Sequence, residues 1–300
     1  MNCDELNSRY GAPGRIVFHE GFGGYPEVVI ANKYGVAEIA LLGGNVLSYR
    51  PTGFSQILFR PRKRDYRRGD AFHGGIPVCW PQFGNRFDKS LPGHGFAKLL
   101  VFEVRGTQYS EDMTEITLGA RSNADTLEIW PHEFDLELKV SVSMKLNLKL
   151  TTLNTGKKPF GFSCGFHPYF LVRERNQAVV HGLDGVGYFN AMENAEGFQK
   201  GTLAIDHEVD HVFNVGNLPK HELALVDEGL NRAVAVVFSG GRKAVVWCAD
   251  PGNTIADFER EDWRSFVCVE PVSDWPGGME LKSGEKHELT VAIQAQTKTV

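Results

Sequence analysis

The stretch LELKVSVSMKLNLKL, residues 136–150, places an apolar side chain at almost every second position. The residues between them are mostly Glu, Lys, Ser and Asn. Because successive side chains of a β-strand point to opposite faces, the pattern predicts a half-buried strand, or two strands joined by a tight turn near Met144. A helix would distribute the same leucines around its axis.

Similar patterns recur along the chain. Residues 233–238 and 243–248 are apolar segments on either side of Gly240 and Gly241, which predicts a strand, a two-glycine turn and a second strand. No amphipathic helix of twelve residues stands out, and no linker divides the chain. We therefore expect one all-β domain, residues 1–300, made of two packed sheets. Further strands are expected at residues 16–19, 28–31, 37–42, 99–105, 115–120, 265–269 and 289–296.

Composition narrows the class of protein. Hydrophobic residues make up 42% of the 300 residues and charged residues 23%, a balance typical of a globular chain. The net charge of −5 argues against a general nucleic-acid binder. The five cysteines contain no CxxC pair, which argues against a disulfide framework. The sequence has neither a signal-peptide pattern at its start nor a long apolar run, so we expect a cytoplasmic location.

Several familiar catalytic signatures are absent, among them the phosphate-binding GxxxxGK[ST] loop, the GxSxG elbow and HExxH. Four short segments rich in glycine, proline and aromatic residues remain, and each carries a His or a Glu. Glycines let a backbone approach a ligand closely, and prolines fix its course. Trp80 and Phe83 either form a wall for a sugar ring or belong to the core. The segments are FHGGIPVCWPQFG (72–84), LPGHGFAK (91–98), GFHPYF (165–170) and FVCVEP (266–271).

In this order, the four segments resemble the aldose 1-epimerase superfamily, and most closely its glucose-6-phosphate 1-epimerase (hexose-6-phosphate mutarotase) branch. The resemblance implies a large antiparallel β-sandwich of the galactose-mutarotase type and an isomerase that interconverts sugar anomers. His167 matches the family's general acid and Glu270 its general base. Asp210 resembles an aspartate that hydrogen-bonds sugar hydroxyls, and His94 a histidine beside the ring. We expect Gln82 to contact the substrate as well.

The chemistry of mutarotation explains these residue types. A base takes the proton from the C1 hydroxyl while an acid protonates the ring oxygen, and the two groups act in reverse after rotation about C1–C2. A carboxylate, with a pKa of about 4.3, suits the role of the base, and an imidazolium, with a pKa of about 6.5, suits the role of the acid. No metal, nucleotide or flavin is needed, and the ten histidines show no ligand spacing. We therefore expect no cofactor and no metal.

Two positions depart from the branch pattern, which has Arg where this chain has His73 and Lys98. Those arginines bind the phosphate, and Lys and His cannot form the same two-pronged contact. Arg86 and the basic residues 60–68 (RPRKRDYRR) could restore positive charge, although such a loop is also typical of a solvated surface. We expect a C6-anionic aldohexose such as glucose 6-phosphate. A 6-sulfonated or a neutral aldose remains the alternative.

A non-catalytic carbohydrate-binding sandwich is the competing hypothesis from another class of protein. The presence of both His167 and Glu270 favours the enzyme, because a protein that only binds sugar has no need of an acid–base pair. The expected partner is a small sugar or sugar phosphate, with no nucleic acid and no membrane. We expect a monomer or a weak homodimer.

Overall fold

The protein is almost entirely β in the computed structural model, which describes residues 1–61, 72–85, 88–250, 252, 255 and 257–298. Within these residues the α-helices are short: α1 spans Cys3–Tyr10 and α2 spans Ala124–Ile129. Four single 3-10 turns complete the helical structure, at Phe22–Gly24, Ala97–Leu99, Arg175–Gln177 and Asp262–Arg264. The prediction of an all-β fold is confirmed.

A nine-stranded antiparallel sheet forms one layer. The alternating stretch forms two adjacent strands of this sheet, β8 (Phe134–Val142) and β9 (Leu146–Asn154), with every second residue buried and Val142 opposite Leu146. The two-strand alternative is therefore the observed one. In sheet order the strands are β16 (Leu203–Ala204), β13 (Ala178–His181), β18 (Glu222–Asp227), β19 (Arg232–Ser239), β23 (Lys286–Thr297), β9 (Leu146–Asn154), β8 (Phe134–Val142), β7 (Thr114–Arg121) and β6 (Glu103–Tyr109).

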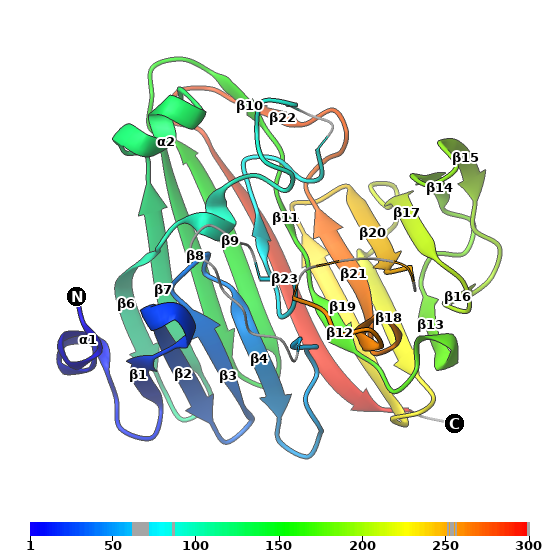
Figure 1. Ribbon diagram of the computed structural model, residues 1–300, viewed down its shortest axis with the longest axis horizontal. Coiled ribbons are helices and arrows are strands. Elements are labelled where there is room, and N and C mark those ends of the chain that lie inside the picture. The colour runs from blue at the N-terminus through cyan, green and yellow to red at the C-terminus, as the bar shows by residue number, and fades with distance from the viewer. Residues whose placement is uncertain (62–71, 86–87, 251, 253–254, 256, 299–300) are drawn as a thin grey trace.

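The facing layer is divided into separate sheets, whereas the sequence predicted two sheets in all. Figure 1 shows β1–β4 and the group β17, β20 and β21 side by side across the nine-stranded sheet. One buried cluster joins all three sheets and contains, for example, Ile30, Leu138 and Val246. The four-stranded sheet is β1 (Ile16–Glu20), β2 (Pro26–Asn32), β3 (Gly35–Ala40) and β4 (Val46–Pro51). The eight-stranded sheet is β15 (Ala195–Phe198), β14 (Gly187–Asn190), β17 (Val209–Asn214), β20 (Lys243–Cys248), β21 (Phe266–Val272), β11 (Gly165–Phe166) and β5 (Val78–Cys79), with β12 (Tyr169–Leu171) also paired to β21. A small pair, β10 (Phe160–Phe162) and β22 (Met279–Leu281), completes the fold.

One predicted strand begins later than expected. Leu99 ends a 3-10 turn, and β6 starts only at Glu103. The backbone N–H groups of Phe96 and Ala97 both donate to the carbonyl oxygen of Trp80, at 2.9 and 3.0 Å. These contacts fix the turn against the segment around Trp80, so this part of the chain positions a loop and does not extend the sheet.

The two-glycine turn connects the two layers. The strands β19 and β20 form as predicted, but they do not pair with each other: β19 pairs with β18 and β23, while β20 pairs with β17 and β21. At Gly240 φ is 78°, and a Cβ there would collide with the carbonyl oxygen of Glu288. Glycine is required here because the backbone crosses between layers in direct contact with β23.

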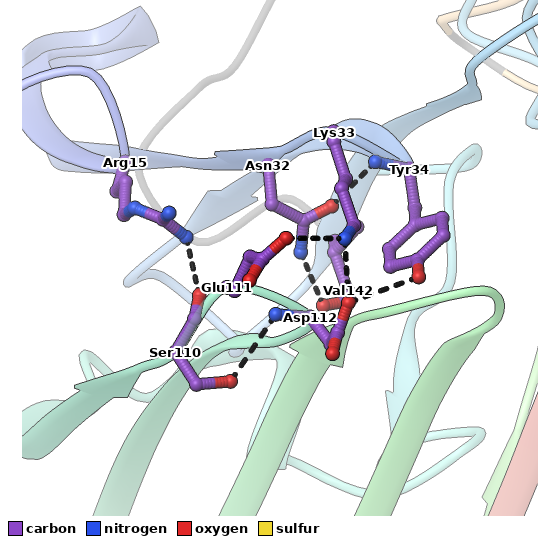
Figure 2. Close-up of polar contacts among 8 residues, drawn as sticks. All are labelled: Arg15, Asn32, Lys33, Tyr34, Ser110, Glu111, Asp112 and Val142. Carbon is purple, nitrogen blue, oxygen red and sulfur yellow. Dashed lines mark hydrogen bonds and ion pairs between the residues drawn. The ribbon is translucent and has the colours of Figure 1, made fainter.

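Polar contacts join the four-stranded sheet to the nine-stranded one (Figure 2). The side-chain amide of Asn32 donates to the carbonyl oxygen of Val142 at 2.7 Å. Lys33 lies 3.0 Å from Glu111 and 2.7 Å from Asp112, both in the turn between β6 and β7. These ion pairs are exposed and each contributes little, so we assign the alignment of the two sheets mainly to the half-buried Asn32 contact and the core.

The crossing generates a stability prediction. Gly240→Ala should lower the free energy of unfolding by more than about 2 kcal/mol, since it combines a left-handed φ with a backbone collision. Gly284→Ala is the matched control, because φ is 77° there with nothing within 4 Å of an added Cβ. We expect the control to cost only about 1 kcal/mol. Urea denaturation measures both, and equal losses would contradict the proposed close approach.

Candidate active site

A cavity of about 460 Å³ lies on the outer face of the eight-stranded sheet. Strand alternation creates this face: Val267 and Val269 of β21 join the core, and Glu270 points the other way into the cavity. The neighbouring strands contribute Trp247 and Asp210 in the same manner. The cavity lining includes His73, Cys79, Phe83, His94, Lys98, His167, Tyr169, Asp210, Trp247 and Glu270.

The predicted acid–base pair is a direct contact. His167 lies in the loop between β11 and β12, and its backbone N–H donates to the carbonyl oxygen of Pro77 at 3.0 Å. Its Nε2 lies 3.4 Å from Glu270 Oε2, and the two side chains are 11% and 1% exposed. His167 Nδ1 and Glu270 Oε2 are both buried without a hydrogen-bond partner among the described residues. Buried polar atoms are nearly always paired, so this arrangement indicates a site that a ligand completes.

Burial decides the protonation of the pair. Desolvation, with help from the nearby His94 and His73, lowers the pKa of His167 well below its usual value. Desolvation, with a smaller contribution from Asp210, raises the pKa of Glu270 well above its usual value. Both shifts favour the uncharged forms, a neutral imidazole and a protonated carboxyl. These directions differ from the imidazolium and carboxylate that the sequence analysis expected, and they favour the arrangement with the acidic proton on Glu270.

His94 is held as a neutral hydrogen-bond donor. Burial, followed by the charges of Lys98 and His73, lowers its pKa to about 4. Its Nδ1 lies 3.3 Å from the backbone nitrogen of Gly84 and accepts that N–H. In a neutral imidazole the other ring nitrogen then carries the proton, so Nε2 is the donor. The ring centroid lies 5.3 Å from that of His167, which places this donor beside the acid–base pair.

Lys98 and His73, which the sequence analysis expected at the substrate site, both line the cavity. Lys98 Nζ donates to the carbonyl oxygen of Gly93 at 2.8 Å, and burial lowers the pKa of Lys98. His73 Nδ1 lies 2.9 Å from Asp257 Oδ1, and the His73 backbone N–H donates to Asp257 Oδ2 at 2.8 Å. Asp257 was missed in the sequence, where nothing marks a contact across 184 residues. Asp257 therefore contacts both the ring and the backbone N–H of His73 at the cavity wall.

Gln82, which the sequence analysis expected to contact the substrate, lies outside the lining of this cavity. It is fully buried, and its amide nitrogen donates to the carbonyl oxygens of Leu91 and Pro92 at 3.2 and 2.9 Å. Its amide oxygen accepts from the backbone N–H of Asp88 at 2.9 Å. These bonds use the side-chain amide of Gln82 to hold the loop that precedes His94.

The aromatic residues divide between core and site. Trp80 is fully buried in the main core, whereas Phe83 lines the cavity and packs edge-on against His94 at 5.0 Å. Sequence reasoning missed Tyr169, which stacks on His167 at 4.6 Å, and also Trp247, whose ring centroid lies 5.9 Å from that of His167. The signal for Tyr169 was its place two residues after His167, since such neighbours share a face in extended chain.

Two predicted sources of positive charge at the substrate site lie wholly or partly outside the described residues. Arg86 is one of them, and residues 62–68 of the basic loop are the other. Arg60, at the start of that loop, is described, and its Nη1 lies 2.6 Å from Glu38 Oε2 in β3. Arg60 therefore forms an ion pair within the facing layer, away from the cavity.

Two groups of side chains have the spacing of metal ligands within the described part of the chain. His19, Glu27 and Glu38 form one group, and Arg60 already pairs with Glu38 there. The other group contains the acid–base pair itself, His167 and Glu270, together with Cys268. Their ligand atoms all lie within 4.8 Å of one another.

Comparison with known proteins gives a consistent result. Residues 26–294 match the family model described as aldose 1-epimerase. A protein of Cenchrus ciliaris named "Putative glucose-6-phosphate 1-epimerase" is 29% identical over 273 residues, 86% of this chain and 81% of the relative. A protein of the same name from Escherichia coli K12 is 28% identical, with 81% of each chain covered.

Solved structures share the fold. The crystal structure of a "putative mutarotase" from Salmonella typhimurium superposes with a TM-score of 0.88 at 23% identity, covering 98% of this chain and 99% of the other. A galactose mutarotase-like protein from Clostridium acetobutylicum gives a TM-score of 0.75 at 17% identity, covering 94% of this chain and 98% of the other.

No helix in the described residues is long and apolar enough to cross a membrane.

The buried carboxyl generates a stability prediction with a defined pH dependence. The folded pKa of Glu270 is raised, so above about pH 4.3 ionisation favours the unfolded chain. Glu270→Gln should therefore raise the free energy of unfolding at pH 7 by about 1–3 kcal/mol, because the amide has no ionisation that favours the unfolded chain. The gain should disappear as the pH falls below about 4, where both states of the wild-type carboxyl are protonated.

Glu280→Gln, at an exposed carboxyl on β22, is the control and should change little at either pH. Thermal unfolding monitored by circular dichroism measures all three proteins. A Glu270→Gln variant that is less stable than the wild type at pH 7 would show that the pKa of this carboxyl is not raised.

Proposed function

The chain belongs to the aldose 1-epimerase family, and we propose that it interconverts the α and β anomers of an aldohexose that carries an anion at C6. One observation supports this chemistry most: His167 Nε2 and Glu270 Oε2 lie 3.4 Å apart, and both buried side chains line the same cavity. An isomerase of this family acts on a small sugar, and the cavity of about 460 Å³ has the size of a small-molecule site.

The pair needs one proton to work in either direction. With that proton on Glu270, the carboxyl is the acid and the neutral His167 is the base. With it on His167, the imidazolium is the acid and Glu270 is the base. Mutarotation requires one of each at every stage, because one group takes the C1 hydroxyl proton while the other protonates the ring oxygen. The roles reverse when the ring closes on the other face of C1, so a pair that shares one proton serves both steps.

The surrounding residues orient the sugar in this proposal. The Nε2–H of His94 donates to a sugar oxygen beside the pair, and Asp210 accepts from a ring hydroxyl. Tyr169 and Phe83 hold the two imidazoles by stacking and edge contacts, at 4.6 and 5.0 Å. Fixed donors and acceptors lower the cost of ordering the substrate in the reactive geometry.

The anion at C6 binds Lys98, with His73 as a weaker ligand. Lys98 lies partly buried in the cavity wall, and the protein as a whole is acidic, so its positive charge is a local feature. An anion beside this ammonium group offsets the desolvation that lowers the pKa of Lys98. We propose 6-phosphate as the leading substituent and 6-sulfonate as the alternative.

We also propose a reducing, cytoplasmic environment. All five cysteines are free thiols, and four of them are buried. One of the buried thiols, Cys79, lines the cavity, and its Sγ lies 3.3 Å from His94 Nδ1. A reducing compartment keeps such thiols intact.

Removal of either proton-transfer group tests the acid–base assignment. His167→Asn and Glu270→Gln should each lower kcat by about 10²–10⁴-fold, because each keeps the size of the side chain and loses one role. Exchange NMR between the anomers of glucose 6-phosphate measures the rate. His181→Asn and Glu280→Gln, at exposed sites, are the matched controls. Near-wild-type exchange in either pair variant would refute the assignment.

The shared proton predicts a broad plateau in the pH profile. The pKa of His167 is lowered, so activity should fall on the acid side only at a pH well below about 6.5. There the imidazole is protonated, and the pair holds two protons in place of one. Because the pKa of Glu270 is raised, activity should fall on the alkaline side only at a pH far above about 4.3. Measurement of kcat/KM between pH 4 and 10 tests this, and a narrow maximum centred between about 4.3 and 6.5 would contradict it.

Charge at C6 is tested by comparing substrates. We expect kcat/KM to be higher for glucose 6-phosphate than for glucose and to fall with added salt, which screens the attraction. Lys98→Met should remove most of that preference while changing glucose turnover little. Lys158→Met, at an exposed lysine, is the control. Equal use of neutral glucose without a salt effect would refute the anion site, and preference for 6-sulfoglucose would keep the site and change the substituent.

A further inference from the structure

We propose that the acid–base pair and Cys268 form a binding site for a zinc-type divalent cation, and that the bound ion blocks the sugar site. The ligand atoms of His167, Cys268 and Glu270 lie within 4.8 Å of one another. Imidazole nitrogen, thiolate sulfur and carboxylate oxygen form a ligand set typical of zinc in proteins. The binding of the ion does not depend on the proposed sugar chemistry, whereas the inhibition rests on it.

Strand geometry brings the three groups together. Cys268 and Glu270 are two residues apart on β21, so their side chains lie on the same face of the sheet. Tyr169 of β12 pairs with Cys268, and this pairing carries the loop with His167 over the same two positions. The site is therefore formed by β21 of the eight-stranded sheet and by the loop that leads into its neighbour β12.

The distance between the two catalytic atoms fits a shared metal. Two ligands at about 2.1 Å from a tetrahedral zinc ion lie about 3.4 Å apart. His167 Nε2 and Glu270 Oε2 lie 3.4 Å apart before any ion is bound. Little rearrangement of the pair is needed, and only the thiol has to turn toward the ion.

The pair also has unused bonding capacity. Glu270 is 1% exposed, and its Oε2, which points at His167, has no hydrogen-bond partner in the described structure. A buried carboxylate oxygen in this state gains a strong interaction when a cation arrives. When the ion binds, the Cys268 thiol and the Glu270 carboxyl each release a proton, the resulting thiolate and carboxylate balance the charge of the dication, and neutral His167 adds a third ligand.

The cavity supplies the entry route and the fourth coordination position. His167 and Glu270 line its wall, so the ion reaches them from the same side as the sugar. An ion held between these two atoms occupies the place where the C1 hydroxyl and the ring oxygen bind in the proposed mechanism. Zinc should therefore compete with the sugar and leave kcat at saturating sugar unchanged.

Cobalt(II) binding tests the site without any activity measurement. Full-length wild-type protein titrated with Co²⁺ alone should develop a thiolate-to-cobalt charge-transfer absorption and the visible bands of a four-coordinate ion. Cys268→Ser should lose the charge-transfer absorption, and Cys268→Ala gives a second, independent removal of the sulfur. Cys164→Ser, at a fully buried cysteine, and Cys79→Ser, at a thiol that lines the cavity, should retain it.

Zinc inhibition of anomer exchange is the functional readout. We expect Zn²⁺ to raise the apparent KM of the wild type at constant kcat, and EDTA to reverse the effect. Cys268→Ser should weaken the inhibition by more than about tenfold, since even residues outside the ligand shell contribute that much to metal affinity, while keeping the metal-free kcat. Unchanged inhibition in Cys268→Ser, or a charge-transfer band that survives there and disappears in Cys79→Ser, would overturn the proposal. A protein that binds cobalt through Cys268 but shows no anomer exchange would contradict the proposed function and leave the metal site standing.

Discussion

Burial of the contact between His167 and Glu270 is the constraint on which the rest of the site depends. Two ionisable groups 3.4 Å apart in a water-poor position cannot each keep the charge they have in solution. Desolvation lowers the pKa of one and raises that of the other, and a single proton shared by the pair satisfies both shifts. Such a pair is neutral, so it can be buried without the large cost of separate charges. It also contains one acid and one base at all times, which is what proposed anomer exchange requires.

The scaffold keeps this contact in place by using rigid elements on both sides. Glu270 lies within β21, and His167 is fixed through its backbone bond to Pro77 and its stacking on Tyr169. The loop that carries His94 is held by Gln82, whose amide is bonded entirely to backbone groups. The sheet below is locked to the opposite layer by the close crossing at Gly240. The cost of this precision is an unsatisfied buried carboxyl oxygen, so the protein is expected to be less stable at neutral pH than it would be without Glu270.

The sequence predicted the fold class well because its main signal is local. Alternation in residues 136–150 describes β8 and β9 directly, and three of the four short segments contain His94, His167 and Glu270, which line one cavity together with Asp210. Contacts between distant segments left no such signal. The pairing of β19 and β20 with different sheets, the occupation of Gln82 by loop carbonyls and the contact of His73 with Asp257 all depend on tertiary packing. The direction of the pKa shifts of the pair left no signal in the sequence either, because burial is a property of the whole fold.

A double-mutant cycle on the acid–base pair tests the central claim most directly. The rate of anomer exchange is measured by NMR for the wild type, His167→Asn, Glu270→Gln and the double variant, with glucose 6-phosphate as substrate. If the two groups act as one unit that shares a proton, the double variant should be no slower than the slower single variant, because loss of either group already disables both steps. If the two losses multiply, each group contributes independently, and the account of a shared proton in a buried pair is wrong.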